Sequence, residues 1–316
     1  MKARYLLLIL CAFPVLGTAQ NTAVGGPVSG FVFDQKAQSV RPMLGVPGAA
    51  YLGDAALSGV DAAGVAQDGN AALVSMEGRL YLVTGLKSDT TTTASIDGAI
   101  DGIDRIAWAA GGDSAAVYAS RSGRAQLLRK LSGTPEAGDA LDLSALPGSL
   151  TALASAGDGI LAAVAEEADG GVYFVKAGAA PRLLASAVKP AGLAVSGADL
   201  YFADQGTGQV WQIAGFAGDA TRLLFAEGLQ SPVGVQVAGK RLFVANAGDN
   251  TLEIFDMTAR ASAGRLALDV APTTLESFGG RALWLLNGAG AAGDPLYVLD
   301  GGDNPAVYFV PAGREE

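Results

Sequence analysis

Short apolar runs separated by polar turns follow one another along most of the chain. Each run has four to six residues rich in β-branched and aromatic side chains, and Gly, Asp, Asn or Ser residues separate the runs. Two of them, 200–203 and 242–245, are almost continuously apolar, which is typical of strands that are covered on both faces. No segment has a sustained 3.6-residue apolar period with caps, so the pattern predicts an all-β protein.

The runs recur at a fixed spacing. The segment 190–204 matches 232–246 position by position at an offset of 42 residues, and both continue into a Gly and a further apolar run. The segment 279–287 repeats the pattern at an offset of 41 residues, and weaker units are visible between residues 62 and 184. A period of about 40 residues with four strands per unit predicts a β-propeller of four-stranded antiparallel blades.

The number of blades follows from the length of the repeating region. Residues 26–313, divided by the observed spacing, give about seven units, although only six units show a complete pattern. Seven blades are therefore favoured and six stay possible. The N-terminal runs 30–34 and 40–44 predict a hairpin, which we expect to pair with a C-terminal strand at 307–310 so that the chain ends share the last blade. Glycines such as Gly197, Gly239 and Gly248 are expected to adopt positive φ in tight turns.

The repeats resemble NHL repeats and the related YVTN-type propeller repeats. The pattern Pro-x-Gly-(apolar)-x-Val, followed by Leu-(aromatic)-(apolar)-Ala-(Asp/Asn)-x-Gly, carries the resemblance over residues 190–256. It implies a closed ring of blades around a central channel.

The N-terminus has the pattern of an export signal. Lys2 and Arg4 precede an apolar stretch from 5 to 16, and Gly17-Thr18-Ala19 offers small residues for cleavage after Ala19. We therefore expect a signal peptide at 1–19, a short linker at 20–29, one propeller domain at 30–313, and a periplasmic or extracellular location. No later segment is apolar for long enough to span a membrane.

Composition narrows the possible chemistry. The chain has no His and one Cys, which excludes a Ser-His-Asp triad, a His general base and a Cys-rich metal site. The formal net charge of −10 is not that of a nucleic-acid-binding protein. We expect a monomer.

Candidate ligand-binding residues occur after the second strand of the clearest units. They are Asp204, Asn246 and Asn287, with Asp249 in a neighbouring acidic turn. Their oxygens suit a ligand or a divalent cation such as Ca²⁺ or Mg²⁺, but Asp and Asn before Gly are also typical of hairpin turns. We expect the three tryptophans, Trp108, Trp211 and Trp284, to pack between blades, and arginines such as Arg182 and Arg222 to be solvated at blade edges.

The function predicted from these features is binding. A secreted scaffold propeller would recognise a protein, peptide or glycan through loops at one end of its channel. The alternative is a metal-dependent lactonase-like or hydrolase-like propeller that uses Asp and Asn ligands in the channel mouth. The streptogramin-lyase type, which similar repeats suggest, requires a catalytic His that this chain lacks.

Overall fold

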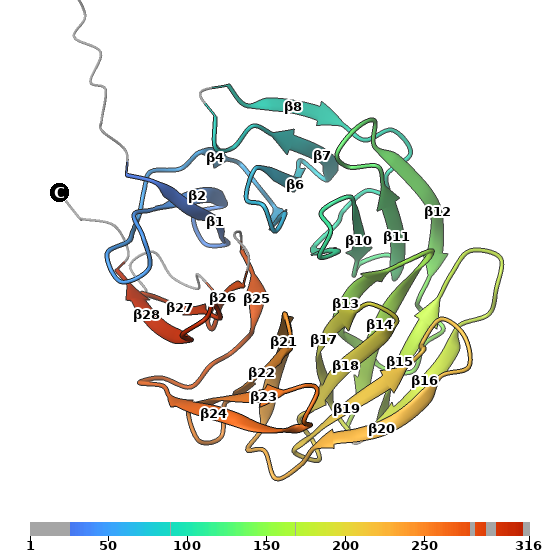
Figure 1. Ribbon diagram of the computed structural model, residues 1–316. Coiled ribbons are helices and arrows are strands. Elements are labelled where there is room, and N and C mark those ends of the chain that lie inside the picture. Colours follow the sequence, from blue (N-terminus) through green and yellow to red (C-terminus); the bar gives the residue numbers. More distant parts are fainter. Residues whose placement is uncertain (1–25, 89, 168, 279–281, 289–294, 312–316) are drawn as a thin grey trace, which may run out of the picture.

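The computed structural model describes residues 26–88, 90–167, 169–278, 282–288 and 295–311. These residues form seven antiparallel sheets and no helix. The sheets follow one another around a ring, as Figure 1 shows, so the protein is a seven-bladed β-propeller. Six blades, the open alternative, are thereby excluded, and the predicted signal peptide lies outside the described residues. No helix in the described part of the chain is long and apolar enough to cross a membrane.

The blades are numbered 1–7 along the chain, and the strands within each blade run outward from the centre of the ring. The first strands of blades 2–7 are β5 (Ala62–Val65), β9 (Arg105–Trp108), β13 (Ser149–Ala156), β17 (Pro190–Ser196), β21 (Pro232–Ala238) and β25 (Glu276–Ser277). The second strands are β1 (Val28–Asp34), β6 (Ala71–Met76), β10 (Ser114–Ala119), β14 (Gly159–Glu166), β18 (Asp199–Asp204), β22 (Arg241–Asn246) and β26 (Leu283–Leu285). The third strands are β2 (Ser39–Leu44), β7 (Arg79–Thr84), β11 (Arg124–Arg129), β15 (Asp169–Val175), β19 (Gln209–Ala214), β23 (Thr251–Asp256) and β27 (Leu296–Asp300). The fourth strands of blades 2–7 are β8 (Thr92–Ser95), β12 (Glu136–Asp142), β16 (Arg182–Ala187), β20 (Thr221–Ala226), β24 (Ala261–Ala267) and β28 (Ala306–Val310).

Blade 1 is built differently from the other six. Its strands β3 (Tyr51–Leu52) and β4 (Leu57–Ser58) both pair with β2, β3 at Met43–Leu44 and β4 at Ser39–Val40. Because β1 occupies the other side of β2, β3 and β4 lie end to end as the fourth strand of the blade. The Val60 N–H donates to the Gln38 carbonyl, as the Leu229 N–H donates to Gly208 in blade 5, so β1 and β2 take the places of β18 and β19. Within the described residues, blade 1 therefore has no first strand of its own.

The ring closes where blades 1 and 7 meet, but within the described residues the two ends of the chain do not share a blade. Strand β1 pairs with β2, and β28 pairs with β27, so the expected pairing between the N-terminal hairpin and residues 307–310 is wrong. Apolar side chains of the two blades form one buried cluster instead, with Val32, Met43 and Leu52 against Leu296 and Val298. This burial closes the ring together with one backbone hydrogen bond, from the Phe31 N–H to the Phe278 carbonyl at 3.2 Å.

The glycine of the repeat pattern lets neighbouring first strands approach closely. A Cβ on Gly192 would lie 2.9 Å from the Cα of Gly234, and a Cβ on Gly234 would lie 2.6 Å from the Cβ of Leu275. Any larger residue at either position would push two first strands apart. This close approach explains why Gly recurs after Pro190 and Pro232.

Turn geometry confirms two of the three predicted positive-φ glycines. Gly197 has φ 60 and Gly239 has φ 59, whereas Gly248 is not in the left-handed region. The positive φ in that turn falls on Asn250 (φ 54). Position 248 requires Gly for a steric reason instead, since a Cβ there would lie 3.0 Å from the Gln230 carbonyl oxygen.

Candidate functional site

The second strands of all blades end on the same side of the ring, because each blade repeats the same antiparallel order. Asp204 and Asn246 are the last residues of β18 and β22, and Asn287 lies two residues beyond the end of β26. Asp249 is in the turn after Asn246. The structure therefore places all four candidate residues at one end of the ring, which we call the Asp204 end.

Asp204 is buried, with 1% of its surface exposed. Its Oδ1 accepts hydrogen bonds from the backbone N–H groups of Lys189 (2.9 Å) and Gly206 (3.1 Å), and its Oδ2 accepts one from Val188 (3.1 Å). The carboxylate thus holds the segment before β17 against the turn after β18. A carboxylate with three such donors is an effective turn cap and has little capacity left for a ligand.

Asn246 occupies the same place in blade 6 with a different set of contacts. Its Nδ2 donates to the Thr251 hydroxyl at 3.3 Å, and its Oδ1 is buried with no hydrogen-bond partner among the described residues. Thr251 in turn donates to Asp249 at 2.7 Å, and the other oxygen of Asp249 is paired with Arg265. Asn246 and Asp249 are therefore joined through Thr251 in one small network.

Asn287 fastens the turn between β26 and β27. Its Nδ2 donates to the Pro295 carbonyl at 2.9 Å, and its Oδ1 accepts the Tyr297 N–H at 2.7 Å. These contacts and those of Asp204 are local turn chemistry. The role of these residues in ligand binding stays a prediction, and the geometry favours the turn interpretation that the sequence left open.

Charge is distributed unevenly between the two ends of the ring. Four of the six described lysines, Lys87, Lys130, Lys176 and Lys240, lie in turns at the end opposite Asp204. The Asp204 end carries Lys36 and Lys189, together with Arg79, Arg105, Arg121 and Arg124. The Asp204 end carries a ring of exposed carboxylates: Asp61, Glu77, Asp97, Asp101, Asp104, Asp142, Glu166, Glu167, Asp169, Glu227, Asp269 and Glu276. The sequence signals this asymmetry only when the direction of each strand is known.

The tryptophans pack between blades as expected. Trp108 and Trp211 lie against buried clusters that join neighbouring blades, and Trp284 is 2% exposed and contacts Phe243 with ring centroids 5.2 Å apart. Of the edge arginines, Arg222 is exposed, as expected, and Arg182 is half-buried, and both also contact other blades. Arg182 donates to the Gly218 carbonyl of the next blade at 2.8 Å, and Arg222 stacks over Trp211 at 3.7 Å while bonding Ser186 of the preceding blade.

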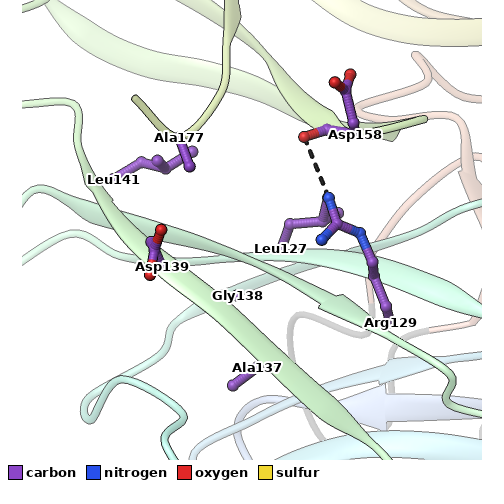
Figure 2. Close-up of a pocket in the computed structure, with 8 residues that line it drawn as sticks. All are labelled: Leu127, Arg129, Ala137, Gly138, Asp139, Leu141, Asp158 and Ala177. Carbon is purple, nitrogen blue, oxygen red and sulfur yellow. Dashed lines mark hydrogen bonds between the residues drawn. The ribbon is translucent and has the colours of Figure 1, made fainter. Parts of the chain in front are cut away.

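Two hollows that the sequence did not predict flank the outer strand of blade 3. One, of about 200 Å³, lies between β12 and blade 4, where Asp139 and Leu141 face Asp158 and Ala177 (Figure 2). Arg129 borders it and donates to the Asp158 carbonyl at 3.2 Å. The other, of about 570 Å³, lies between β12 and the loop 98–101. Small residues and an irregular register at 137–140 leave this space.

The described residues contain no group of three or more Asp, Glu or Cys side chains placed to hold a metal ion.

Buried Gln126, near the second hollow, has three hydrogen bonds, to Gly98, Ile100 and Gly138. It joins the loop 98–100 to β12 and has a structural role.

Solved structures of known proteins share the fold. A functionally unknown protein from Desulfotomaculum acetoxidans is 11% identical, with a TM-score of 0.60 over 90% of this chain and 99% of that chain. A chain of the nidogen/laminin complex is 16% identical (TM-score 0.50, covering 75% of this chain and 93% of that one). Virginiamycin B lyase from Staphylococcus aureus is 10% identical (TM-score 0.50, 78% and 83%).

At these identities the likeness shows the fold alone: this chain is a β-propeller, a class with diverse functions. No protein-family model matches the chain, and no curated protein matches it.

Proposed function

We propose that this protein is a binding propeller that recognises a basic protein or peptide through the loops at its Asp204 end. The charge difference between the two ends of the ring carries the proposal. A ring of exposed carboxylates at one end attracts a cationic partner and orients it, whereas four of the six described lysines lie in turns at the other end. A chain of the nidogen/laminin complex, a protein assembly, has the same fold, which is consistent with a binding role.

Catalysis has less support. A lactonase-like site would need free oxygens on Asp204, Asn246 and Asn287 to coordinate a metal. Asp204 and Asn287 instead use their oxygens in hydrogen bonds to the backbone. The virginiamycin B lyase of similar fold has a catalytically inactive variant in which a His is replaced by Ala, and this chain contains no His.

Two further sequence features, the repeat motif and the export signal, complete the proposal. We infer from the motif at 190–256 that the blades are of the NHL or YVTN type, and from the pattern at 1–19 that the protein is exported. Expression of the full chain in a bacterial host, followed by N-terminal sequencing of the periplasmic fraction, tests export. A new N-terminus at Gln20 is expected, and an intact Met1 in the cytoplasm would contradict it.

Binding can be tested with charged probes on the chain that starts at Gln20. Fluorescence anisotropy is measured with a labelled Lys/Arg-rich peptide and with a Glu-rich peptide of equal length, at low and high salt. We expect the basic peptide alone to bind, and to bind at least about tenfold more weakly at high salt, because salt screens exposed charges. Equal binding of both peptides, or no effect of salt, would overturn the proposal.

Matched variants locate the contact. Asp97 and Asp101 are exposed at the Asp204 end, and Asp219 and Asp303 are in turns at the opposite end. The double variant Asp97→Asn/Asp101→Asn is expected to weaken the basic peptide at least about fivefold, and Asp219→Asn/Asp303→Asn less than about twofold. Equal losses in both would show a general charge effect and no site at this end.

A further inference from the structure

The larger of the two hollows opens at the Asp204 end of the ring. Its volume of about 570 Å³ lies between the loop 98–101, which joins blades 2 and 3, and the outer strand β12. This volume is in the range of small-molecule pockets, about 300–1,000 Å³. Most of the exposed carboxylates of the Asp204 end belong to residues 61–169, the sector of blades 2–4 that contains the hollow, and there they outnumber the arginines.

Buried Gln126 holds the two walls of the hollow together. Its Oε1 accepts the Ile100 N–H at 2.9 Å, and its Nε2 donates to the Gly98 carbonyl of the loop at 2.9 Å. The same Nε2 donates to the Gly138 carbonyl of β12 at 2.7 Å. Because Gln126 is only 2% exposed, water does not compete for these bonds. The hollow is therefore formed before a ligand arrives, and binding costs little ordering of its walls.

The hollow is peculiar to blade 3 and does not follow from the repeat. Gln126 occupies the place in the third strand that Trp211 has in blade 5 and Tyr81 has in blade 2. Those two aromatic rings pack into the clusters that join their blades to the preceding ones. In blade 3 the shorter amide bonds the backbone instead, and the irregular register of β12 at 137–140 widens the space.

Apolar and acidic groups share the lining of the hollow. The side chains of Ala99, Ile100 and Ala140 are half-buried, and those of Asp101 and Asp139 are exposed. Asp139 also borders the smaller hollow, where Figure 2 shows it. Apolar walls with carboxylates near the surface suit a side chain that has a methylene stem and a cationic head.

One cationic side chain, Arg124, also lines the hollow. Its partner in the register of β11 and β12 is Asp142, directly across the sheet. Opposite charges in such cross-strand positions offset each other. The two other carboxylates of the lining, on Asp101 and Asp139, are therefore available to a cationic ligand.

We propose that this hollow binds one lysine or arginine side chain of the basic partner. The methylene stem lies along Ala99, Ile100 and Ala140, and the cationic head lies at Asp101. This inference rests on the proposed function, because it assumes the same basic partner. It adds a requirement for side-chain length, which attraction between opposite charges alone does not have.

The first test compares two labelled peptides of equal charge on the chain that starts at Gln20. One carries lysines, and the other carries 2,4-diaminobutyric acid, whose side chain is shorter by two methylenes, at the same positions. Fluorescence anisotropy at a pH where both are fully charged should show at least about fivefold tighter binding of the lysine peptide, because its longer stem buries more apolar surface. Equal affinities would overturn the hollow and leave the proposed function standing.

The second test fills the hollow without changing any charge. Ala140→Phe is expected to weaken the lysine peptide at least about fivefold, to the level of the short-chain peptide, and Ala177→Phe, at the smaller hollow, less than twofold. Urea denaturation checks that both variants fold, and if Ala140→Phe does not, the two peptides on the unaltered chain decide. Unchanged binding by a folded Ala140→Phe would overturn the proposal.

The failure of the proposed function is recognised separately. If neither peptide binds the unaltered chain, partner recognition at the Asp204 end is wrong, and N-acetyl-lysine methylamide then tests the hollow by itself. Saturable NMR shifts of the backbone amides at 98–101 and 138–140 would support a site for a cationic side chain there. An absence of such shifts would overturn the hollow as well.

Discussion

Blades 5 and 6 have the same strand order at an offset of 42 residues, but different hydrogen bonds hold their loops in place. In blade 5 the charged Asp204 collects the N–H groups of Val188 and Lys189. In blade 6 the neutral Asn246 has no such donors, and the preceding segment is turned over at Ser231 (φ 54), so that the Gln230 carbonyl accepts the Gly248 N–H at 2.9 Å.

The same contrast recurs between the third and fourth strands. Blade 5 stacks Arg222 over Trp211, while blade 6 pairs Arg265 with Glu253, the residue 42 positions after Trp211. One repeat pattern therefore supports two local solutions. A polar residue conserved in place between two blades need not have the same contacts, so its position alone is weak evidence for a ligand site.

The largest effect is expected from a substitution that disrupts the close approach of first strands, which both blades share. Gly234→Val would drive a side chain into Leu275 of the next blade, and we expect a loss of about 3 kcal/mol in the free energy of unfolding from this overpacking. Urea denaturation measures it. Gly218→Ala is the control, since a Cβ there meets nothing within 4 Å. Equal stability of the two variants would show that the first strands can separate without cost.

Exchanging Asp204 and Asn246 tests whether these loop hydrogen bonds stabilise the two blades differently. Asp204→Asn and Asn246→Asp should each lower the free energy of unfolding by about 2 kcal/mol. The first removes the charge that holds Val188 and Lys189, and the second buries a charge where these donors are missing. If Asn246→Asp were neutral or stabilising in urea denaturation, the preceding segment of blade 6 would be able to turn its N–H groups inward, and the contrast would be one of sequence only.

The arginine contacts should differ in size and in their response to salt. Arg222→Ala is expected to cost about 1 kcal/mol, because the guanidinium stacks on an indole and bonds Ser186. Arg265→Ala, at a largely exposed ion pair, should cost less than about 1 kcal/mol and lose most of that effect at high salt. Chemical denaturation in urea at two salt concentrations compares them. If Arg265→Ala lowered the free energy of unfolding more than Arg222→Ala, and equally at both salt concentrations, the Arg265 contact would be the stronger one.

The smallest effect concerns a turn that only blade 6 has. The backbone N–H groups of Ala259 and Thr258 hold the pKa of Asp256 below its usual value near 3.8, and the counterpart in blade 5 is Ala214. Because the pKa is lower in the folded protein, the contribution of Asp256 is present above about pH 4 and lost as the pH falls through the folded value. Asp256→Asn should therefore unfold at lower urea than wild type near pH 6, with the gap closing near pH 2. A gap that stays constant with pH would contradict this.

Much of the fold could be predicted because the repeat is written into local patterns. The matched segments 190–204 and 232–246 predicted strands that blades 5 and 6 contain, and the spacing favoured the seven blades that the structure has. The closure could not be predicted, because the apolar residues of 307–310 suit a strand in blade 7 as well as one paired with the N-terminal hairpin. Which strand they join depends on long-range packing such as that between Val32 and Leu296.

The candidate site was predicted in place but not in its contacts. The position of Asp204 after an apolar run indicated an ordered polar residue in a turn, and the structure has it there. Its three N–H donors come from segments on both sides of β17 and β18, which sequence spacing does not bring together. The interblade hydrogen bonds of Arg182 and Arg222 could not be predicted for the same reason, since their partners belong to other blades.

The amino-acid sequence by itself determined the all-β class, the four-strand unit and the absence of histidine chemistry, and it favoured seven blades over six, because these depend on composition and on patterns within about 40 residues. Only the tertiary structure decided at which end of the ring the exposed carboxylates gather, how blades 1 and 7 close the ring, and that the described part of blade 1 has no first strand. These features depend on strand direction and on contacts between residues far apart in the chain, and local patterns carry no information about either.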